Sequence, residues 1–497
     1  MNAVAKKRIR RWFGFLLSCQ LLLAGCSMKE APSSVKEASD SAPPAYYQNP
    51  LLKNAADPGV LKASDGKYYA YPTGGNKFEA YSSRDLVHWS KEGVALSGKE
   101  LKWANTKFWA PEVIERSGKY YMFFSAAADD GVPKISVAVS DSPKGPFKHP
   151  SEKPLFDFGV GTIDPYIFQD DDGKTYMYYT KNLFEVGDHK ESHIYVAELA
   201  PDLLSVKGEP KLLLKPEQAW EVASGKMRWN EGSFVLKRNG TYYLMYSANC
   251  YCGRAYAVGY ATSKQATGPF TKYANNPILN APYKEVSGTG HHSVTASPDG
   301  KELFIVYHTH IDPAKGGGAR QLNIDRMGIA PDGTLYVNGP TMTKQPMPSG
   351  VSEWSNIAPE ATVTASSANK SFPADNVKDG MYAMAVKNGK GEWVTEGEPE
   401  GSWIKLDWSS PREISDVLLY DSADTRRALL SGKLYVDGDK TPLTVTFPKE
   451  PGAAAIVTVG RKNVKSLKLV IDQTLLAGKE TGLAEMIVLG KDHILKQ

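Results

Sequence analysis

One short pattern recurs five times along the chain and constrains its fold more than any other feature. Each copy is a turn dipeptide ending in glycine, followed by a run of aromatic and aliphatic residues. This combination is typical of a hairpin turn that leads into a β-strand. The copies are DGKYYAYPT from Asp65, SGKYYMFFS from Ser117, DGKTYMYYT from Asp172, NGTYYLMYS from Asn239 and DGKELFIVYHT from Asp299. Such a repeat indicates that one small structural unit is used five times.

Further strand-like segments flank each copy. A segment such as PGVLKAS or PEVIERS precedes it, and in most units a third segment such as FEAYSSRD or ISVAVSDS follows it. Each unit is therefore expected to be an antiparallel meander, and a radial arrangement of such sheets is a propeller. We predict an all-β chain with a five-bladed β-propeller over residues 46–347. The alternative is a β-sandwich whose hairpins resemble one another by chance.

Acidic residues and histidines gather where the first strand of each unit begins. In a propeller these first strands line one central cavity, so residues far apart in the sequence meet there. They are Asp57, Glu112, Asp164, Glu231 and the pair His291–His292. A carboxylate beside an apolar strand is costly to desolvate, so the pattern indicates a functional site. Each acid also has a structural alternative as a turn or surface residue.

Carboxyl groups that face each other across a cavity are what glycoside hydrolysis requires. One acts as general acid and the other as general base, and an inverting enzyme separates them by about 6.5–9.5 Å to leave room for water. A third carboxylate nearby raises the pKa of the acid by like-charge repulsion. A propeller that only binds glycans is the alternative, but it has no need for such an acid.

Five short motifs make the interpretation more specific. ADPGV, FWAPEV, GTIDPYIF, NEGSFV and GTGHHSV occur in this order, one in each repeat. The set resembles glycoside hydrolase family 43, the five-bladed enzymes that act on arabinose- and xylose-containing polysaccharides. The resemblance covers about residues 46–345. The signatures of the related fructan-cleaving propellers are not met.

The resemblance implies roles for three acids. Asp57 would be the general base that activates water, and Glu231 the general acid that protonates the leaving oxygen. Asp164 would orient Glu231 and raise its pKa. The implied activity is inverting hydrolysis of arabinan, arabinoxylan or derived oligosaccharides, by an α-L-arabinofuranosidase or arabinanase. A β-D-xylosidase of the same family is the alternative.

Other residues follow from the same resemblance or from their place beside the acids. His291 matches a histidine that lies near a water or a calcium ion, which makes it a candidate metal ligand, although His292 stands where many members have Asn. Arg320 is expected to hold Asp164 or the sugar, and Glu112 to be structural. The residues expected to contact substrate are Trp109, Phe108, Trp229, Arg320 and His291. No cofactor is required beyond a structural calcium ion, which stays open.

Residues 355–492 carry a second pattern of short alternating strands, which predicts a β-sandwich. The segments NVKDG and SWIKLDW resemble a discoidin-like (coagulation factor type C) domain, a jelly roll also used as a carbohydrate-binding module. The resemblance places Asp379 in a stretch that often helps bind calcium. Trp393, Trp403 and Trp408 are expected in the core. A purely structural domain is the alternative to a glycan-binding one.

The N-terminus has the features of a targeting segment. Five basic residues precede the apolar run Trp12–Leu23, and LAGC, ending at Cys26, resembles a bacterial lipobox. We expect residues 1–25 to be a lipoprotein signal peptide, Cys26 to be lipidated and residues 26–45 to form a flexible tether. The protein would then be exported and anchored to the bacterial membrane. A short transmembrane anchor is the alternative.

Charge and the remaining cysteines add little. The formal net charge is +4, and removal of the five basic residues in the signal leaves −1, so nothing favours nucleic acid as a partner. Cys250 and Cys252 are two residues apart, so they are either free thiols or a strained disulfide. Two cysteines alone offer too few ligands for zinc.

Overall fold

The computed structural model describes residues 45–281, 284–382, 391–397, 399–450, 452–476, 478 and 480–492. The predicted signal peptide, the lipidation site Cys26 and all of the tether except Ala45 lie outside these residues. No helix among the described residues is long and apolar enough to cross a membrane.

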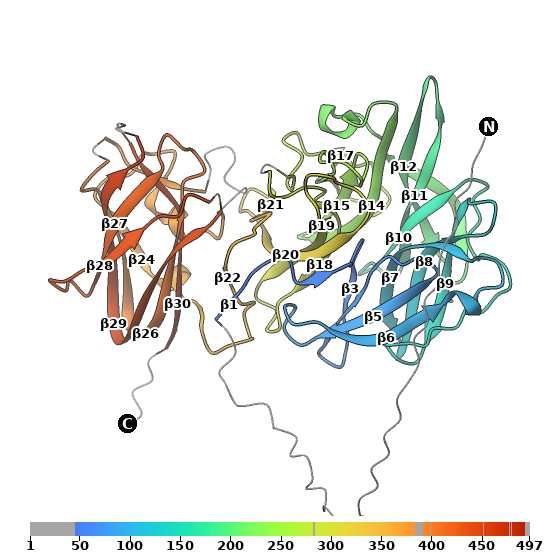
Figure 1. Cartoon of the computed structure of the whole chain (residues 1–497), viewed down its shortest axis with the longest axis horizontal. Helices are drawn as coiled ribbons and strands as arrows, with labels where there is room; N and C mark the ends of the chain where they lie inside the picture. Colours follow the sequence, from blue (N-terminus) through green and yellow to red (C-terminus); the bar gives the residue numbers. More distant parts are fainter. Residues whose placement is uncertain are drawn as a thin grey trace, which may run out of the picture. The chain divides into compact units, whose positions relative to one another are not determined.

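The first part of the structure is the predicted five-bladed β-propeller (Figure 1). Strands pair antiparallel with their neighbours in the chain within each blade. In order, the blades are β3 (Gly59–Lys62), β4 (Tyr68–Tyr71), β5 (Lys77–Ser83) and β6 (Ser90–Ser97); β7 (Thr106–Arg116), β8 (Lys119–Ala127) and β9 (Pro133–Ser140); β10 (Thr162–Gln169), β11 (Thr175–Val186), β12 (His189–Leu199) and β13 (Val206–Leu214); β14 (Met227–Arg238), β15 (Thr241–Ala248), β16 (Ala257–Ser263) and β17 (Thr271–Lys272); and β18 (Gly290–Ala296), β19 (Leu303–His310), β20 (Arg320–Ile329) and β21 (Leu335–Val337).

The fifth blade is completed by a strand from the other end of the propeller sequence. Strand β2 (Leu52–Lys53) precedes the first blade but pairs with β20 of the fifth. Strand β1 (Tyr46–Tyr47) likewise pairs with β22 (Gln345–Pro346). These pairings join the beginning and the end of the propeller sequence, which repeat counting alone did not predict.

The five repeated turns form as predicted. Their glycines all have positive φ, a conformation that costs glycine little and other residues more. They are Gly66, Gly118, Gly173, Gly240 and Gly300, with φ between 69° and 84°. Each turn connects the first strand of a blade to the second, so the repeat marks the same hairpin in every blade.

Aromatic residues fill the space between the first two blades. Phe78 on β5, Phe108 on β7 and Phe124 on β8 share one buried cluster, with the rings of Phe78 and Phe108 5.4 Å apart. Phe108 is fully buried, so the expectation that it contacts substrate is wrong. Burying a Phe side chain stabilises a fold by about 1.5–3 kcal/mol, which explains its place in the core.

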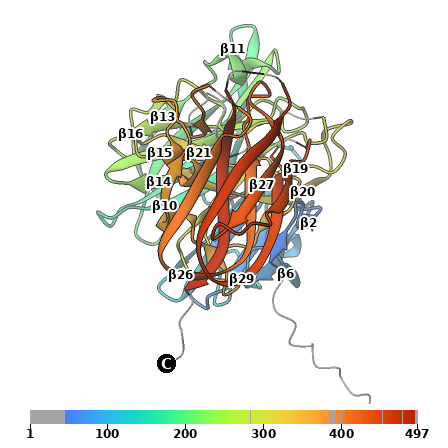
Figure 2. The same ribbon diagram turned by 90° about the vertical axis from the view of Figure 1, so that its left-hand side faces the viewer.

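The second part is a sheet that folds over one large core. Its strands are β23 (Ser355–Asn356), β24 (Thr362–Ala365), β25 (Trp393–Val394), β26 (Trp403–Asp421), β27 (Leu429–Val436), β28 (Leu443–Thr446), β29 (Ala454–Thr474) and β30 (Gly482–Asp492). A second, smaller buried cluster lies on β26 and β30. The long strands β26 and β29 pair along most of their length (Figure 2). Short 3₁₀ turns lie at Ala358–Glu360 and Ala374–Lys378.

Two of the three tryptophans predicted for this core lie in it. Trp393 and Trp408 are buried within the cluster. Trp403 is only partly buried, with the ammonium of Lys468 4.3 Å from its ring, so its assignment to the core is wrong. It is the first residue of β26, where one face of the sheet meets solvent.

Candidate active site

A residue of positive φ lies in each inner strand of the propeller or, in the first blade, just before it. These residues are Asp57 (48°), Ala110 (44°), Asp164 (57°), Gly232 (59°) and His291 (44°). In four blades the strand register shifts at this place, as in a β-bulge. Backbone of this kind is strained for a non-glycine residue and is found where side chains must be aimed at a site.

The equivalence predicted for the five acidic and histidine positions is therefore only partly right. Asp57, Asp164 and His291 share the strained position, one from each of three blades. Glu231 comes one residue before it in the fourth blade, and Glu112 two residues after it in the second. A one-residue offset along a strand sends a side chain to a different side, so the five side chains cannot play equivalent roles.

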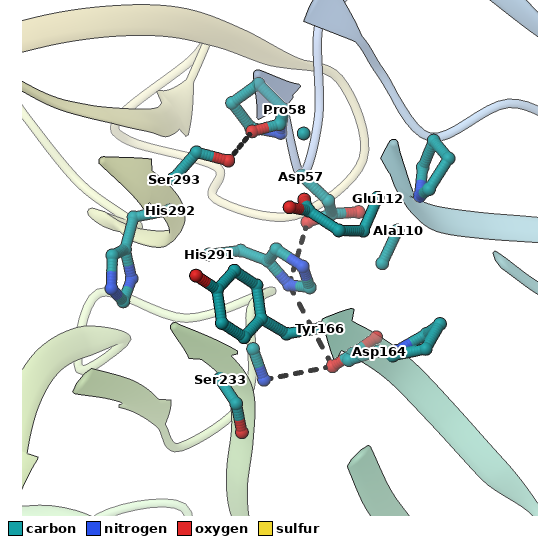
Figure 3. Close-up of a pocket in the computed structure, with 14 residues that line it drawn as sticks. Asp57, Pro58, Ala110, Glu112, Asp164, Tyr166, Ser233, His291, His292 and Ser293 are labelled. Atoms are coloured by element: carbon teal, nitrogen blue, oxygen red, sulfur yellow. Dashed lines mark hydrogen bonds and ion pairs between the residues drawn. The ribbon is translucent and has the colours of Figure 1, made fainter. Parts of the chain in front are cut away.

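All five blades contribute to one pocket on the axis of the propeller, with an empty volume of about 300 Å³. Figure 3 shows His291 in its middle, between Asp57 and Asp164. The lining residues are Asp57, Pro58, Gly59, Ala110, Pro111, Glu112, Asp164, Pro165, Tyr166, Gly232, Ser233, His291, His292 and Ser293.

Asp57 is surrounded by nitrogen groups from the fifth blade. Its Oδ1 accepts a hydrogen bond of 2.6 Å from Nη1 of Arg320 and lies 3.5 Å from Nδ1 of His291. Burial alone would raise the pKa of Asp57, but Arg320, followed by His291, holds it well below its usual range. Asp57 is thus a carboxylate at neutral pH. The expectation that Arg320 holds Asp164 is wrong, because Arg320 holds Asp57.

His308 fixes the backbone of Asp57. Its Nδ1 lies 3.1 Å from both the backbone nitrogen and Oδ1 of Asp57. Burial lowers the pKa of His308 to about 3, so the ring is neutral. Because the backbone N–H can only donate, we assign Nδ1 as its acceptor and place the ring proton on Nε2. Arg320 is then the direct charge partner of Asp57.

Glu231 has a different environment. Its Oε1 accepts a hydrogen bond of 2.8 Å from the hydroxyl of Tyr256. Burial raises the pKa of Glu231 to about 8, the Tyr256 bond opposes this shift, and the charge of Asp57 adds to it. The side chain therefore holds its proton near neutral pH. Burial, more than a neighbouring carboxylate, is the leading cause.

Asp164 lies beside Glu231. Its Oδ2 accepts from the backbone N–H of Gly232 at 3.2 Å, and burial is the first cause that raises its pKa to about 7. The charge of Glu231 also raises it, while His291 lowers it. Ligand atoms of Asp164, Glu231 and His291 all lie within 4.8 Å of one another. Carboxyl groups this close titrate as a pair, so loss of a proton from one opposes loss from the other.

His291 and Gly232 are in close contact. A Cβ on Gly232 would lie 3.2 Å from Nδ1 of His291, and Gly232 has positive φ. Both facts favour glycine after Glu231. His291 Nδ1 is also 4.0 Å from Oδ2 of Asp164. His291 thus lies between the proposed base and the Asp164–Glu231 pair.

Trp109 and Trp229 are partly exposed, but neither lines the pocket. Trp109 pairs across the strands with Ser125, and Trp229 pairs with Ser192. Their contact with a sugar stays a prediction.

Sequence reasoning missed the hydroxyls that hold the strained positions. Each repeat copy ends in Ser or Thr: Thr73, Ser125, Thr180, Ser247 and Thr309. Three of them accept a backbone N–H from the following blade: Thr73 from Ala110, Ser125 from Asp164 and Ser247 from His291, at 2.8–3.1 Å. The shared last residue was a usable signal. Tyr256 and His308 had no comparable signal.

At the other two positions, the backbone N–H is bonded to a different partner. The N–H of Gly232 is bonded to Asp164 instead, and Oγ1 of Thr180 is buried without a hydrogen-bond partner among the described residues. The N–H of Asp57 is bonded to His308. Both departures occur beside the acids of the candidate site.

The comparisons with known proteins agree with the geometry. Residues 47–335 match the family described as "Glycosyl hydrolases family 43", and residues 356–489 match a domain of unknown function (DUF7402). A beta-D-galactofuranosidase of Aspergillus niger is 32% identical over 291 residues, which are 55% of this chain and 78% of the relative. A xylosidase/arabinosidase of Bacteroides ovatus is 29% identical, over 56% and 93% of the two chains.

Among solved structures, a thermostable family-43 glycoside hydrolase is similar with a TM-score of 0.59 and 46% identity. The match covers 61% of this chain and 99% of that structure. With a family match over more than half of its length, this chain belongs to glycosyl hydrolase family 43.

Proposed function

We propose that the protein is an inverting glycosidase of arabinose- or xylose-containing glycans, with α-L-arabinofuranosides as its preferred substrates. The observation that carries this proposal is the opposite tuning of two buried carboxyl groups: Asp57, which lines the pocket, and Glu231, which lies beside the pocket residues Asp164 and His291. Asp57 is held as a carboxylate and Glu231 as a carboxylic acid. The similarity to a galactofuranosidase and a xylosidase/arabinosidase supports a furanoside or pentoside, with β-D-xylosides as the alternative.

The chemistry follows from these protonation states. Asp57 takes a proton from a water molecule, and the oxygen of that water attacks the anomeric carbon. Glu231 gives its proton to the departing glycosidic oxygen as the carbon–oxygen bond breaks. One proton is gained by Asp57 and one is lost by Glu231, so the pair returns to its starting state by exchange with solvent. Asp164 would keep Glu231 oriented and disfavour its ionisation.

Hydrolysis of aryl α-L-arabinofuranoside and aryl β-D-xyloside tests the proposal. The anomer released should be followed by NMR, with the soluble fragment that begins at Ser27. We expect the inverted anomer and faster turnover of the arabinofuranoside. Retention would contradict the roles of Asp57 and Glu231. Tight glycan binding with no hydrolysis of either substrate or of arabinan would favour a non-catalytic binding propeller.

The chain supplies few ligands for a calcium ion in the central pocket, so water would have to provide most of them. Asp164, Glu231 and His291 offer two carboxyl groups and one nitrogen, whereas calcium takes six to eight oxygen ligands. Glu231 would also have to be ionised, which is incompatible with an acid role. We therefore leave the tentative metal role of His291 out of the mechanism.

For the structural calcium we propose Asp379 and Glu485 as two of its oxygen ligands, with water or backbone oxygens completing the coordination. Glu485 is fully buried, its Oε2 accepts from Gly380 N at 3.1 Å, and its Oε1 has no partner among the described residues. Burial and the charge of Asp379 raise the pKa of Glu485 well above its usual range. Calcium should raise the melting temperature of wild-type protein but not that of Glu485→Gln. An equal response of both would exclude this site.

We further propose that residues 355–492 are a discoidin-like, glycan-binding domain and that Cys26 carries a membrane lipid anchor. The strand pattern supports the first proposal, and the lipobox-like LAGC supports the second. Binding of arabinan by residues 355–492 and metabolic labelling of wild-type and Cys26→Ser protein with palmitate would test them.

A further inference from the structure

The loop between β15 and β16 presents a single exposed aromatic ring. Cys250 and Cys252 are joined by a disulfide, and Tyr251 lies between them. Tyr251 is 44% exposed, and among the described residues no other aromatic side chain is exposed to this degree. An exposed aromatic ring offers an apolar face to a ligand.

The covered face of the Tyr251 ring contacts Arg320, which binds Asp57 of the candidate site. The guanidinium carbon of Arg320 lies 4.5 Å from the centre of the Tyr251 ring. Nη1 of the same guanidinium donates to Asp57 at 2.6 Å. Arg320 is only 9% exposed, and its Nε has no partner among the described residues. Tyr251 therefore covers the cation that holds the proposed base.

The position of the loop agrees with this connection. Strand β15 runs antiparallel to β14, so it ends where β14 begins with Glu231 near its start. Strand β20 begins with Arg320 beside the end of β19. The loop after β15 thus emerges at the end of the propeller where Asp57 and Glu231 lie.

Contacts on both sides fix the loop backbone. The carbonyl of Tyr251 is 2.7 Å from Nε2 of His310, whose Nδ1 is 2.8 Å from Oγ of Ser287. The backbone N–H of Cys250 donates to Oγ of Ser224 at 2.9 Å. A Cβ on Gly316 would lie 2.6 Å from the carbonyl oxygen of Cys252, so this loop also packs closely against a glycine. The ring position is therefore built into the fold.

We propose that Tyr251 is a substrate-positioning residue. Its exposed face stacks on a sugar ring of the glycan next to the residue being cleaved, and its covered face keeps water from Arg320. The Cys250–Cys252 bridge holds the ring in this place. This inference rests on the proposed glycosidase function and names a further subsite for it.

Binding to an inactive parent separates this inference from the proposed function. In a Glu231→Gln parent, calorimetric titration with an arabino-oligosaccharide should show about tenfold weaker binding after Tyr251→Ala. Tyr251→Phe keeps the ring, and the Tyr251 hydroxyl makes no hydrogen bond with the described residues, so binding should be restored. Leu212→Ala, which removes another exposed side chain on β13, is the matched control.

Kinetics supply a readout that a merely structural role would not change. Without the ring, water reaches Arg320 and weakens its hold on Asp57, so the acid limb of kcat/KM should move to higher pH. KM should rise more for the oligosaccharide than for a methyl glycoside, which has one sugar. Cys250→Ser/Cys252→Ser should shift both quantities in the same direction by a smaller amount.

The outcomes separate the two proposals. Unchanged oligosaccharide binding after Tyr251→Ala would overturn the subsite, whether or not the wild-type protein is active. Weaker binding without any wild-type hydrolysis would leave the subsite standing and reject the glycosidase proposal. Wild-type behaviour of the double cysteine variant would overturn the role of the disulfide.

Discussion

Two buried carboxyl groups of the candidate site are tuned in opposite ways. Asp57 and Glu231 are equally buried, at 7% and 6% exposure. Asp57 meets Arg320 and His291, and its pKa falls well below the usual range. Glu231 meets the neutral hydroxyl of Tyr256, and its pKa rises to about 8. Burial alone would have made both groups weak acids, so the contacts of Asp57 with Arg320 and His291 of the fifth blade decide which becomes the base.

This difference sets the expected pH dependence. Hydrolysis requires Asp57 without its proton and Glu231 with its proton, so activity rises through the pKa of Asp57 and falls through that of Glu231. The lower limit is well below pH 3.8, because the pKa of Asp57 is depressed. The upper limit is near pH 8. A substitution beside Asp57 should move the acid limb of the pH profile and leave the alkaline limb. A substitution beside Glu231 should do the opposite.

The largest effect is expected from Asp57→Asn, which removes the base. Asn tolerates the positive φ of this position, so the backbone should be kept. The value of kcat should fall by at least ~10³-fold, and the unpaired Arg320 should cost about 3 kcal/mol of unfolding free energy. Turnover and urea unfolding measure these effects. Glu112→Gln, in the same pocket, is the control; an Asp57→Asn enzyme within tenfold of wild type would refute the base assignment.

A smaller effect should follow from Arg320→Gln, which leaves Asp57 in place but removes its cation. The pKa of Asp57 then rises, because burial is no longer opposed by Arg320. The acid limb of kcat/KM should move up by about one pH unit or more, which at low pH is a tenfold loss or more. An acid limb that stays in place would show that Arg320 does not set this pKa.

Tyr256→Phe should change the pKa of Glu231, whereas Arg320→Gln changes that of Asp57. The Tyr256 hydroxyl lowers the pKa of Glu231, so its removal should raise that pKa further above 8. The alkaline limb should move to higher pH, while the rate at the optimum changes by a few-fold at most. A downward shift of the alkaline limb would contradict the assigned hydrogen bond.

The smallest effects compare two hydroxyls that the repeat places equivalently. Ser125→Ala removes the acceptor of the Asp164 N–H and should cost about 1–2 kcal/mol of unfolding free energy. Thr180→Val should cost little, because Oγ1 of Thr180 is buried without a partner among the described residues. Thermal or urea unfolding of both variants measures the difference. Equal losses would mean that Thr180 makes a bond that the structure lacks.

The fold was predictable because its main signal is local. A turn glycine followed by an apolar run specifies a hairpin, and five hairpins of one kind specify five blades. Strand β2 was not predictable in this way, because its pairing with β20 joins segments more than 250 residues apart and depends on closure of the ring. A segment of two residues, Leu52–Lys53, carries no information on such a partner.

The acidic residues of the site could be predicted from the sequence, but the contacts that shift their pKa values could not. Asp57, Asp164 and Glu231 could be found because each directly precedes the strand-like segment before the repeated turn in its own unit. Arg320 lies on a third strand, and its choice of Asp57 over Asp164 depends on which blade is the neighbour in space. Phe108 was misassigned because adjacent residues of one strand, Phe108 and Trp109, face opposite sides, and sequence alone did not say which faces the core.

The pH profile of Glu231→Gln tests the central claim most directly. Hydrolysis of a substrate with a poor leaving group should fall by about 10²–10⁴-fold, and that of an activated aryl glycoside by much less. The alkaline limb near pH 8 should disappear, while the acid limb set by Asp57 stays. Equal losses on both substrates, or an alkaline limb that persists, would show that Glu231 is not the proton donor.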